Sequence, residues 1–260
     1  MVASSQSTVS ASETVPARQS RASQSERSPD QRLSRWGGVA AIAGVVLMVG
    51  TVAVVVGLGL PDASDPETLT DFADIESGRI AEHFLYLGAL VLFALHVFVL
   101  HRLLRPADAA AALFGTVVAA FGLVIMAASS MLHVSTAPLA ELYSAPGTSP
   151  DEQQAIEYAW YGAQSVWDTL LLTGVLLVPI GIVLFGIAMR SAPAFGPRLA
   201  WLTIGIGTVG AVGAAVEVID TGSDLSAVSV LAIVVFNLVV GWRTMTSGNQ
   251  ESSDIRVGNP

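Results

Sequence analysis

The 260-residue chain contains no cysteine and no lysine. Without cysteine it can form no disulfide bond, no thiolate metal site and no cysteine nucleophile. All twelve basic residues are arginine, and 21 aspartate and glutamate residues bring the formal net charge to −9. This acidic balance argues against binding nucleic acid, which needs clustered basic residues to displace phosphate counterions. Dense carboxylates keep a surface hydrated in high salt, so the composition is halophile-like.

Charged residues of either sign are also scarce. They make up 13% of the chain, whereas a soluble domain carries about 25%, and 52% of the residues are hydrophobic. Six predominantly apolar runs are each long enough to cross a bilayer core of about 30 Å. The predicted spans cover residues 36–60, 81–104, 109–133, 165–189, 198–218 and 224–242. The sequence therefore predicts an all-α, polytopic integral membrane protein with a six-transmembrane-helix bundle.

This pattern divides the chain into three regions. Residues 1–35 are rich in serine, glutamine and arginine, and we expect them to form a disordered cytoplasmic tail. Residues 36–242 form the predicted six-helix transmembrane domain, and residues 243–260 a cytoplasmic C-terminal tail. Within the transmembrane domain, segments 61–80 and 134–164 are expected to be long polar connections.

Arginine placement predicts the orientation in the membrane. If both termini are cytoplasmic, eleven of the twelve arginines lie on the cytoplasmic side and only Arg79 lies on the other. Acidic residues follow the opposite distribution, and ten of the 21 lie in segments 61–80 and 134–164. Because arginine and lysine are enriched in cytoplasmic loops, we expect a multi-pass protein of the cell membrane with both termini in the cytoplasm.

Four ionisable residues are predicted to reach the outer membrane boundary. His83 begins the second span, His133 ends the third, Asp168 lies one turn inside the fourth and Glu217 ends the fifth. Ionisable groups at membrane depth are costly and are therefore functional candidates. Together they would form an outer polar cluster that binds a metal ion or accepts protons. The alternative is that each side chain reaches interfacial water separately.

A haem is another group that two of the same residues, the histidines, could bind. A b-type haem held between two helices needs one histidine from each at matching depth, and His83 with His133 meets that condition. No cofactor is predicted, and a single haem between these two residues is the open alternative.

His96 lies several residues inside the second span. At about 100° per residue it cannot share a helical face with His83. We expect it to be buried and to hydrogen-bond a neighbouring helix, with Asn237 of the sixth span or Thr116 of the third as partner.

Small residues recur four apart in the fifth span, 198–218. Gly207 pairs with Ala211, and Gly210 pairs with Ala214. Such pairs let helix backbones approach closely. They predict either close packing inside the bundle or a homo- or hetero-oligomer formed through this helix.

Segment 167–202, WDTLLLTGVLLVPIGIVLFGIAMRSAPAFGPRLAWL, resembles an uncharacterised six-helix membrane family catalogued as domain of unknown function 4386. The resemblance lies in Trp167 and Asp168 at the start of the helix, the glycine-bearing apolar run, an Arg-Ser turn at 190–191 and a Pro-Arg pair at 197–198. The resemblance implies a six-helix integral membrane protein, and it implies no particular reaction because no activity is established for the family. The long N-terminal tail departs from the family pattern.

The sequence leaves three interpretations of the function open. No Walker motif, no dinucleotide-binding glycine motif and no lysine for a retinal Schiff base is present, so no catalytic residue is predicted. The first interpretation is a structural, regulatory or accessory protein whose partner is the lipid bilayer. The others are a small transporter or ion-linked permease with an outer-leaflet polar site, and a haem- or metal-binding membrane subunit.

Overall fold

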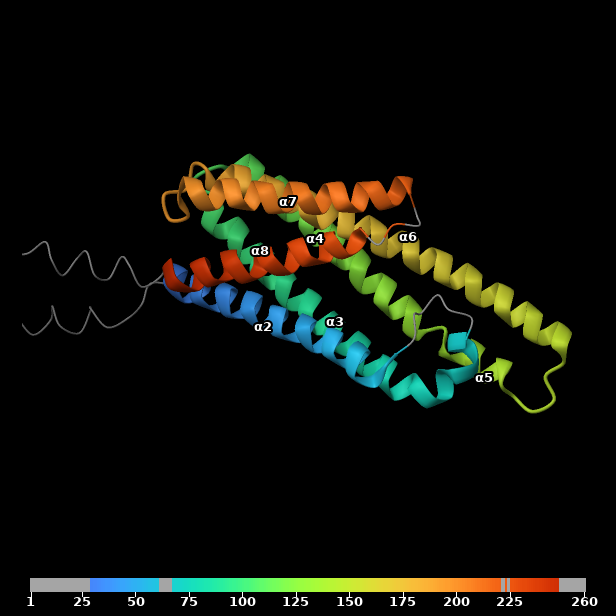
Figure 1. The fold of residues 1–260 in the computed structure, drawn as a ribbon. Coiled ribbons are helices and arrows are strands. Elements are labelled where there is room, and N and C mark those ends of the chain that lie inside the picture. Colours follow the sequence, from blue (N-terminus) through green and yellow to red (C-terminus); the bar gives the residue numbers. More distant parts are fainter. Residues whose placement is uncertain (1–28, 61–66, 221–222, 224, 248–260) are drawn as a thin grey trace, which may run out of the picture.

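The computed structural model describes residues 29–60, 67–220, 223 and 225–247. Over these ranges the chain forms seven α-helices and no strand (Figure 1). They are α2 (Pro29–Leu58), α3 (Glu67–Leu104), α4 (Ala109–Val134), α5 (Ala137–Tyr143), α6 (Pro150–Met189), α7 (Gly196–Ile219) and α8 (Ser226–Ser247). Residues 1–28 of the predicted tail lie outside the described residues, whereas 29–35 form the first two turns of α2.

Six helical stretches are long and apolar enough to cross a membrane. They correspond to α2, α3, α4, α6, α7 and α8, and each includes most of one predicted span. The all-α, multi-pass, six-helix fold predicted from hydropathy is therefore confirmed.

The six long helices form a closed ring. In the order α2, α3, α4, α6, α7 and α8, each packs on the next, and α8 returns to pack on α2. The start of α2 and the end of α8 lie at the same end of the bundle, and α5 lies at the opposite end (Figure 1). We call this opposite end the α5 end.

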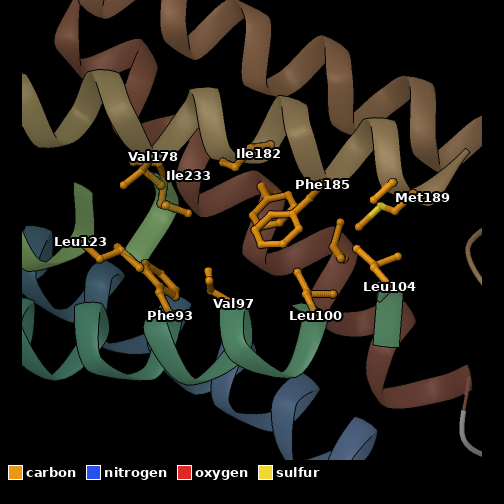
Figure 2. Close-up of a cluster of buried hydrophobic side chains, with 14 of the residues drawn as sticks. Phe93, Val97, Leu100, Leu104, Leu123, Val178, Ile182, Phe185, Met189 and Ile233 are labelled. Atoms are coloured by element: carbon orange, nitrogen blue, oxygen red, sulfur yellow. The ribbon is translucent and has the colours of Figure 1, made fainter. Parts of the chain in front are cut away.

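The core consists of apolar side chains that meet in the middle of the ring (Figure 2). Phe93 of α3, Phe185 of α6 and Phe236 of α8 are each about 1% exposed or less. Outward-facing positions such as Phe121 and Leu231 are also apolar although they are 60% and 61% exposed. A bundle that is apolar on both its inner and outer faces is typical of a protein solvated by lipid.

Two glycines show how closely the helix backbones approach. A Cβ atom placed on Gly181 of α6 would lie 2.7 Å from Cβ and 2.8 Å from the backbone N of Ala119 on α4. One placed on Gly207 of α7 would lie 2.7 Å from the carbonyl oxygen of Pro179 on α6. Gly207, one of the small residues of the fifth span, thus packs against α6 inside the bundle. An oligomer through this helix stays a prediction.

Helices α3 and α6 are longer than a bilayer requires. With 38 and 40 residues, they measure roughly 57 and 60 Å at 1.5 Å per residue, against a hydrocarbon core of about 30 Å. Their extra turns project together with α5 beyond the rest of the bundle (Figure 1). The expectation of polar connections at 61–80 and 134–164 was therefore wrong for most of their length, because these segments are largely helical.

Local interactions explain why α6 begins so far ahead of the membrane. Ser149 accepts a hydrogen bond from the backbone N–H of Glu152, whose carboxylate accepts one from the Ser149 backbone N–H, so the two residues form a capping box. Three turns later Trp160 is fully buried against Leu69 of α3 and Ala140 of α5. This second apolar cluster holds the projecting parts of the three helices together.

Candidate functional site

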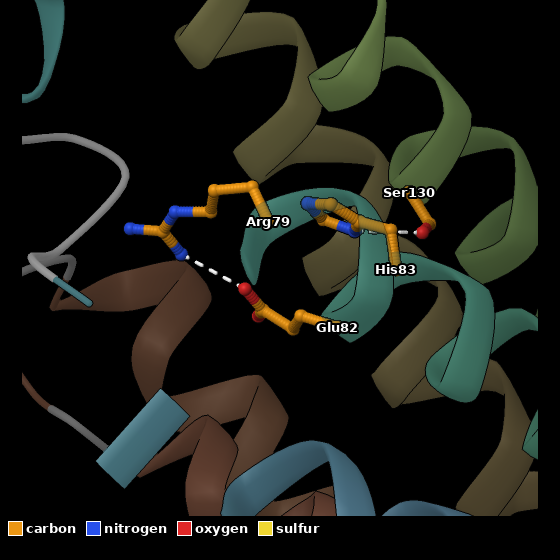
Figure 3. Close-up of polar contacts among 4 residues, drawn as sticks. All are labelled: Arg79, Glu82, His83 and Ser130. Carbon is orange, nitrogen blue, oxygen red and sulfur yellow. Dashed lines mark hydrogen bonds and ion pairs between the residues drawn. The ribbon is translucent and has the colours of Figure 1, made fainter. Parts of the chain in front are cut away.

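His83 takes part in a buried polar contact at the α5 end. It lies on α3, is 6% exposed, and its Nδ1 shares a hydrogen bond of 2.9 Å with Oγ of Ser130 on α4 (Figure 3). The contact joins two neighbouring helices of the ring. The partner of His83 is thus the hydroxyl group of Ser130, which the sequence did not predict.

Arg79 lies one turn before His83 and is only 5% exposed. Its Nη1 donates to Oε2 of Glu82 at 3.0 Å, and the Glu82 side chain is 16% exposed (Figure 3). From the sequence, Arg79 was expected to lie in a polar connection and had no predicted role. The spacing of Arg79, Glu82 and His83, three and four residues apart on one helix face, is the signal that would have found this group.

A pocket of about 540 Å³ lies between α6, α7 and α8 at the same end of the bundle. Its polar lining includes Gln164, Asp168 and Thr169 from α6, Glu217 from α7 and Ser226 from α8. Two of the four residues predicted for the outer polar cluster, Asp168 and Glu217, therefore line one pocket although 49 positions separate them in the sequence.

Glu217 also has a structural role in this pocket. One of its carboxylate oxygens accepts a hydrogen bond from the backbone N–H of Ser226, the first residue of α8. A carboxylate at that position satisfies a free N–H of the helix start and complements the positive end of the helix dipole. The contact fixes the side chain of Glu217 at the wall of the pocket, whereas Asp168 is exposed.

Gln164 is the residue of the pocket whose hydrogen bonding is least satisfied. It is 4% exposed, and neither its amide nitrogen nor its amide oxygen has a hydrogen-bond partner among the described atoms. Leaving a buried amide unpaired costs about 1–3 kcal/mol. Because Gln164 lines the pocket one turn from Asp168, a polar ligand there could pair with the amide and with the carboxylate together.

The other members of the predicted cluster are not shown to join this pocket. His83 bonds to Ser130 and is not among the pocket-lining residues. The backbone of His133 belongs to α4, but its side chain lies outside the described ones. Among the described side chains, no three histidines, aspartates or glutamates come together in a way that could hold a metal ion.

His96 and Asn237 form a separate polar contact in the middle of the bundle. Nδ1 of His96 lies 2.9 Å from Oδ1 of Asn237, and the two residues are 0% and 2% exposed. Of the two partners expected for His96, Asn237 is the one it contacts, whereas the hydroxyl of Thr116 donates to the carbonyl oxygen of Ala112 on its own helix.

Residues 37–242 match the model of a family described as domain of unknown function (DUF4386). The chain belongs to the DUF4386 family. The DUF4386 match begins in the third turn of α2 and ends in α8, so it covers at least part of each of the six long helices, together with His83 and the pocket. No curated protein and no solved structure matches the chain. Membership in DUF4386 therefore assigns no chemistry to the pocket.

Proposed function

We propose that this chain is an accessory or regulatory protein of the cell membrane that binds a small organic cation at its outer face. The observation that carries the proposal is the pocket between α6, α7 and α8. It presents the carboxylates of Asp168 and Glu217 together with the buried, unpaired amide of Gln164.

The charge around the pocket supports a cationic ligand. Arg79 is the one arginine described at the α5 end, and it pairs with Glu82. Acidic residues described at this end are Asp71, Asp74, Glu76, Glu82, Glu141, Asp151, Glu152, Glu157, Asp168, Glu217 and Asp220. Such an excess of one sign raises the local concentration of oppositely charged solutes.

The arginine distribution supports an outward-facing pocket. Arg102, Arg105, Arg190 and Arg198 lie at the bundle end opposite the pocket, together with the start of α2 and the end of α8. Because basic residues favour the cytoplasmic side, both termini would be cytoplasmic and the α5 end would face outward.

The packing below the pocket favours binding over transport. In the next turns of α6 towards the opposite end, Val175, Val178 and Ile182 are at most 3% exposed and belong to the apolar core. A solute that crossed the bilayer with its charge would need polar groups along its path. The close backbone approach of α6 at Gly181 also favours a rigid helix in this region.

The proposal can be tested with choline, ethanolamine and putrescine as ligand probes. The melting temperature of the purified full chain is measured with each probe, and uptake of the same probes is measured in proteoliposomes. We expect at least one probe to raise the melting temperature in a concentration-dependent manner without accumulating in the vesicles, because a ligand that binds only the folded state stabilises it. The absence of any stabilisation would reject the binding function, and accumulation of a probe against its gradient would replace it with transport.

A further inference from the structure

A second cavity lies on the lipid-facing side of the bundle, far from the acidic pocket. It is a groove of about 590 Å³ between α2 and α3. Its lining is apolar except for Arg102 near the end of α3. The volume falls in the range of about 300–1,000 Å³ that small-molecule pockets occupy.

The shape of the groove follows from the size of its side chains. On α2, Gly37, Ala40 and Ala43 leave little bulk on the face that lines the groove. Large side chains stand beside this face, including Trp36 on α2 and Phe98 on α3, which are 71% and 56% exposed. The groove therefore opens towards the bilayer and away from the core.

The position of the groove restricts what can fill it. No water is available in the hydrocarbon region, and an empty groove would lose the dispersion contacts of its lining atoms. From Leu33 to Ala43 the α2 part of the groove measures about 15 Å at 1.5 Å per residue, which is half of a hydrocarbon core of about 30 Å. An acyl chain from a single leaflet matches this length.

The polar end of the groove is basic. Nε and Nη2 of Arg102 donate to Oδ1 of Asp30 at 3.1 and 2.9 Å, and the Arg102 side chain is still 63% exposed. A guanidinium group has five N–H donors, so three remain for another acceptor. Arg32 lies one turn before Trp36, on the face of α2 that lines the groove, and Arg105 directly follows the last residue of α3, three residues after Arg102.

We propose that this groove binds one anionic phospholipid. Its acyl chain lies against the small residues of α2, and its phosphate accepts hydrogen bonds from Arg102 with Arg32 and Arg105 adding positive charge. Guanidinium groups bind phosphate oxygens through strong, charge-assisted hydrogen bonds, and basic sites between transmembrane helices select anionic headgroups. Asp30 competes with the phosphate for the same guanidinium group.

The test uses native mass spectrometry of the purified full chain with equal amounts of phosphatidylglycerol and phosphatidylcholine that carry identical acyl chains. We expect one phosphatidylglycerol to be retained in preference to phosphatidylcholine. Arg102→Gln should weaken phosphatidylglycerol binding about fivefold, the effect of one basic group near an anionic surface. Arg198→Gln removes the same charge from the same end of the bundle, but from α7, and should leave the binding unchanged.

Two further variants separate lipid binding from a structural role of the Asp30–Arg102 ion pair. Ala43→Phe fills the groove while every arginine remains, so it should remove the retained lipid. Asp30→Asn breaks the ion pair but frees the guanidinium group, so it should strengthen phosphatidylglycerol binding. Equal retention of the two lipids by the wild type, equal losses in Arg102→Gln and Arg198→Gln, or weaker binding in Asp30→Asn would each overturn the proposal.

Discussion

Nδ1 of His96 on α3 lies 2.9 Å from Oδ1 of Asn237 on α8, and the contact joins two helices inside the membrane-spanning bundle. The amide nitrogen of Asn237 donates to the carbonyl oxygen of Ile233 at 2.9 Å, so its oxygen points towards the histidine. The proton of this contact therefore belongs to Nδ1 of His96, which donates to the amide oxygen.

Removing either partner should destabilise the bundle, and removing both should cost less than the sum. His96→Leu and Asn237→Leu each leave a buried polar group unpaired, whereas the double variant leaves an apolar contact. We expect a coupling free energy of about 0.6–2 kcal/mol in a double-mutant cycle measured by SDS-induced unfolding. Leu238→Ala, at the neighbouring 45% exposed position, is the control and should change stability little. Additive single effects would show that the contact contributes nothing.

The close approach of α4 and α6 predicts opposite effects of the same substitution at two glycines. Gly181→Ala places a Cβ atom 2.7 Å from Cβ of Ala119 and should destabilise the protein by about 1–3 kcal/mol. Gly205→Ala on α7 meets no atom within 4 Å and should be neutral or stabilising by up to about 1 kcal/mol, because alanine favours the helix. The prediction is tested by measuring the free energy of unfolding of both variants and of the wild type in the same detergent. Equal effects would contradict the observed packing.

The capping box at the start of α6 predicts that a substitution of Ser149 loosens the first turns of this helix. Ser149→Ala removes the hydroxyl group that accepts from the Glu152 N–H, which should cost about 1 kcal/mol and speed hydrogen exchange in the first turns of α6. Ser149→Asp, which keeps a capping acceptor, should restore much of the protection.

The pH dependence of this cap follows from the same contacts. Hydrogen bonds from the backbone N–H and then from the hydroxyl of Ser149 lower the pKa of the Glu152 carboxyl, which lies on the projecting part of α6 outside the membrane. Because the pKa is lowered, the ionised cap stabilises the helix fully at pH values above the ordinary glutamate pKa of about 4.3. This stabilisation is lost as the pH falls through the lowered pKa of Glu152. The protection of the first turn in the wild type should therefore persist at pH 7 and decline in strong acid. Protection that is independent of pH would contradict an ionised cap.

The second apolar cluster predicts that the projecting helices depend on one tryptophan. Trp160→Ala removes a fully buried side chain that contacts Leu69 and Ala140, and should cost about 3–5 kcal/mol of local stability. Faster proteolysis of the segment around α5 would report the loss, while the six membrane helices stay intact. Tyr158→Ala changes a 68% exposed aromatic residue on the same helix and should leave the cleavage rate unchanged.

Hydropathy predicted the membrane helices but not their full lengths, and residues such as Trp160 explain the difference. The six apolar runs are visible because a lipid-solvated helix is apolar on all faces. Segments 67–80 and 150–164 are polar, so hydropathy assigned them to connections. They are helical because a capping box and a small apolar cluster stabilise them, and that cluster brings together residues from three distant parts of the chain.

The candidate site was predictable only in part, because its contacts depend on how the helices pack against one another. Helix direction and depth placed Asp168 and Glu217 at the same end, and the structure brings both to one pocket. The partner of His83 and the burial of Gln164 depend on how the helices are rotated about their axes, which depth alone does not determine. Gln164 lies in a polar stretch and resembles a solvent-exposed residue until the packing of α6 is known.

The most direct test of the pocket is isothermal titration of the purified chain with the stabilising ammonium probe. The wild type should bind one cation per chain, and Asp168→Asn should lower the affinity at least tenfold, because an ionic hydrogen bond in a partly enclosed pocket contributes about 1.5–3 kcal/mol. Asp151→Asn removes the same charge from an exposed position on the same helix and should bind as the wild type does. Unchanged affinity in Asp168→Asn, or equal losses in both variants, would show that the cation does not occupy the pocket between α6, α7 and α8.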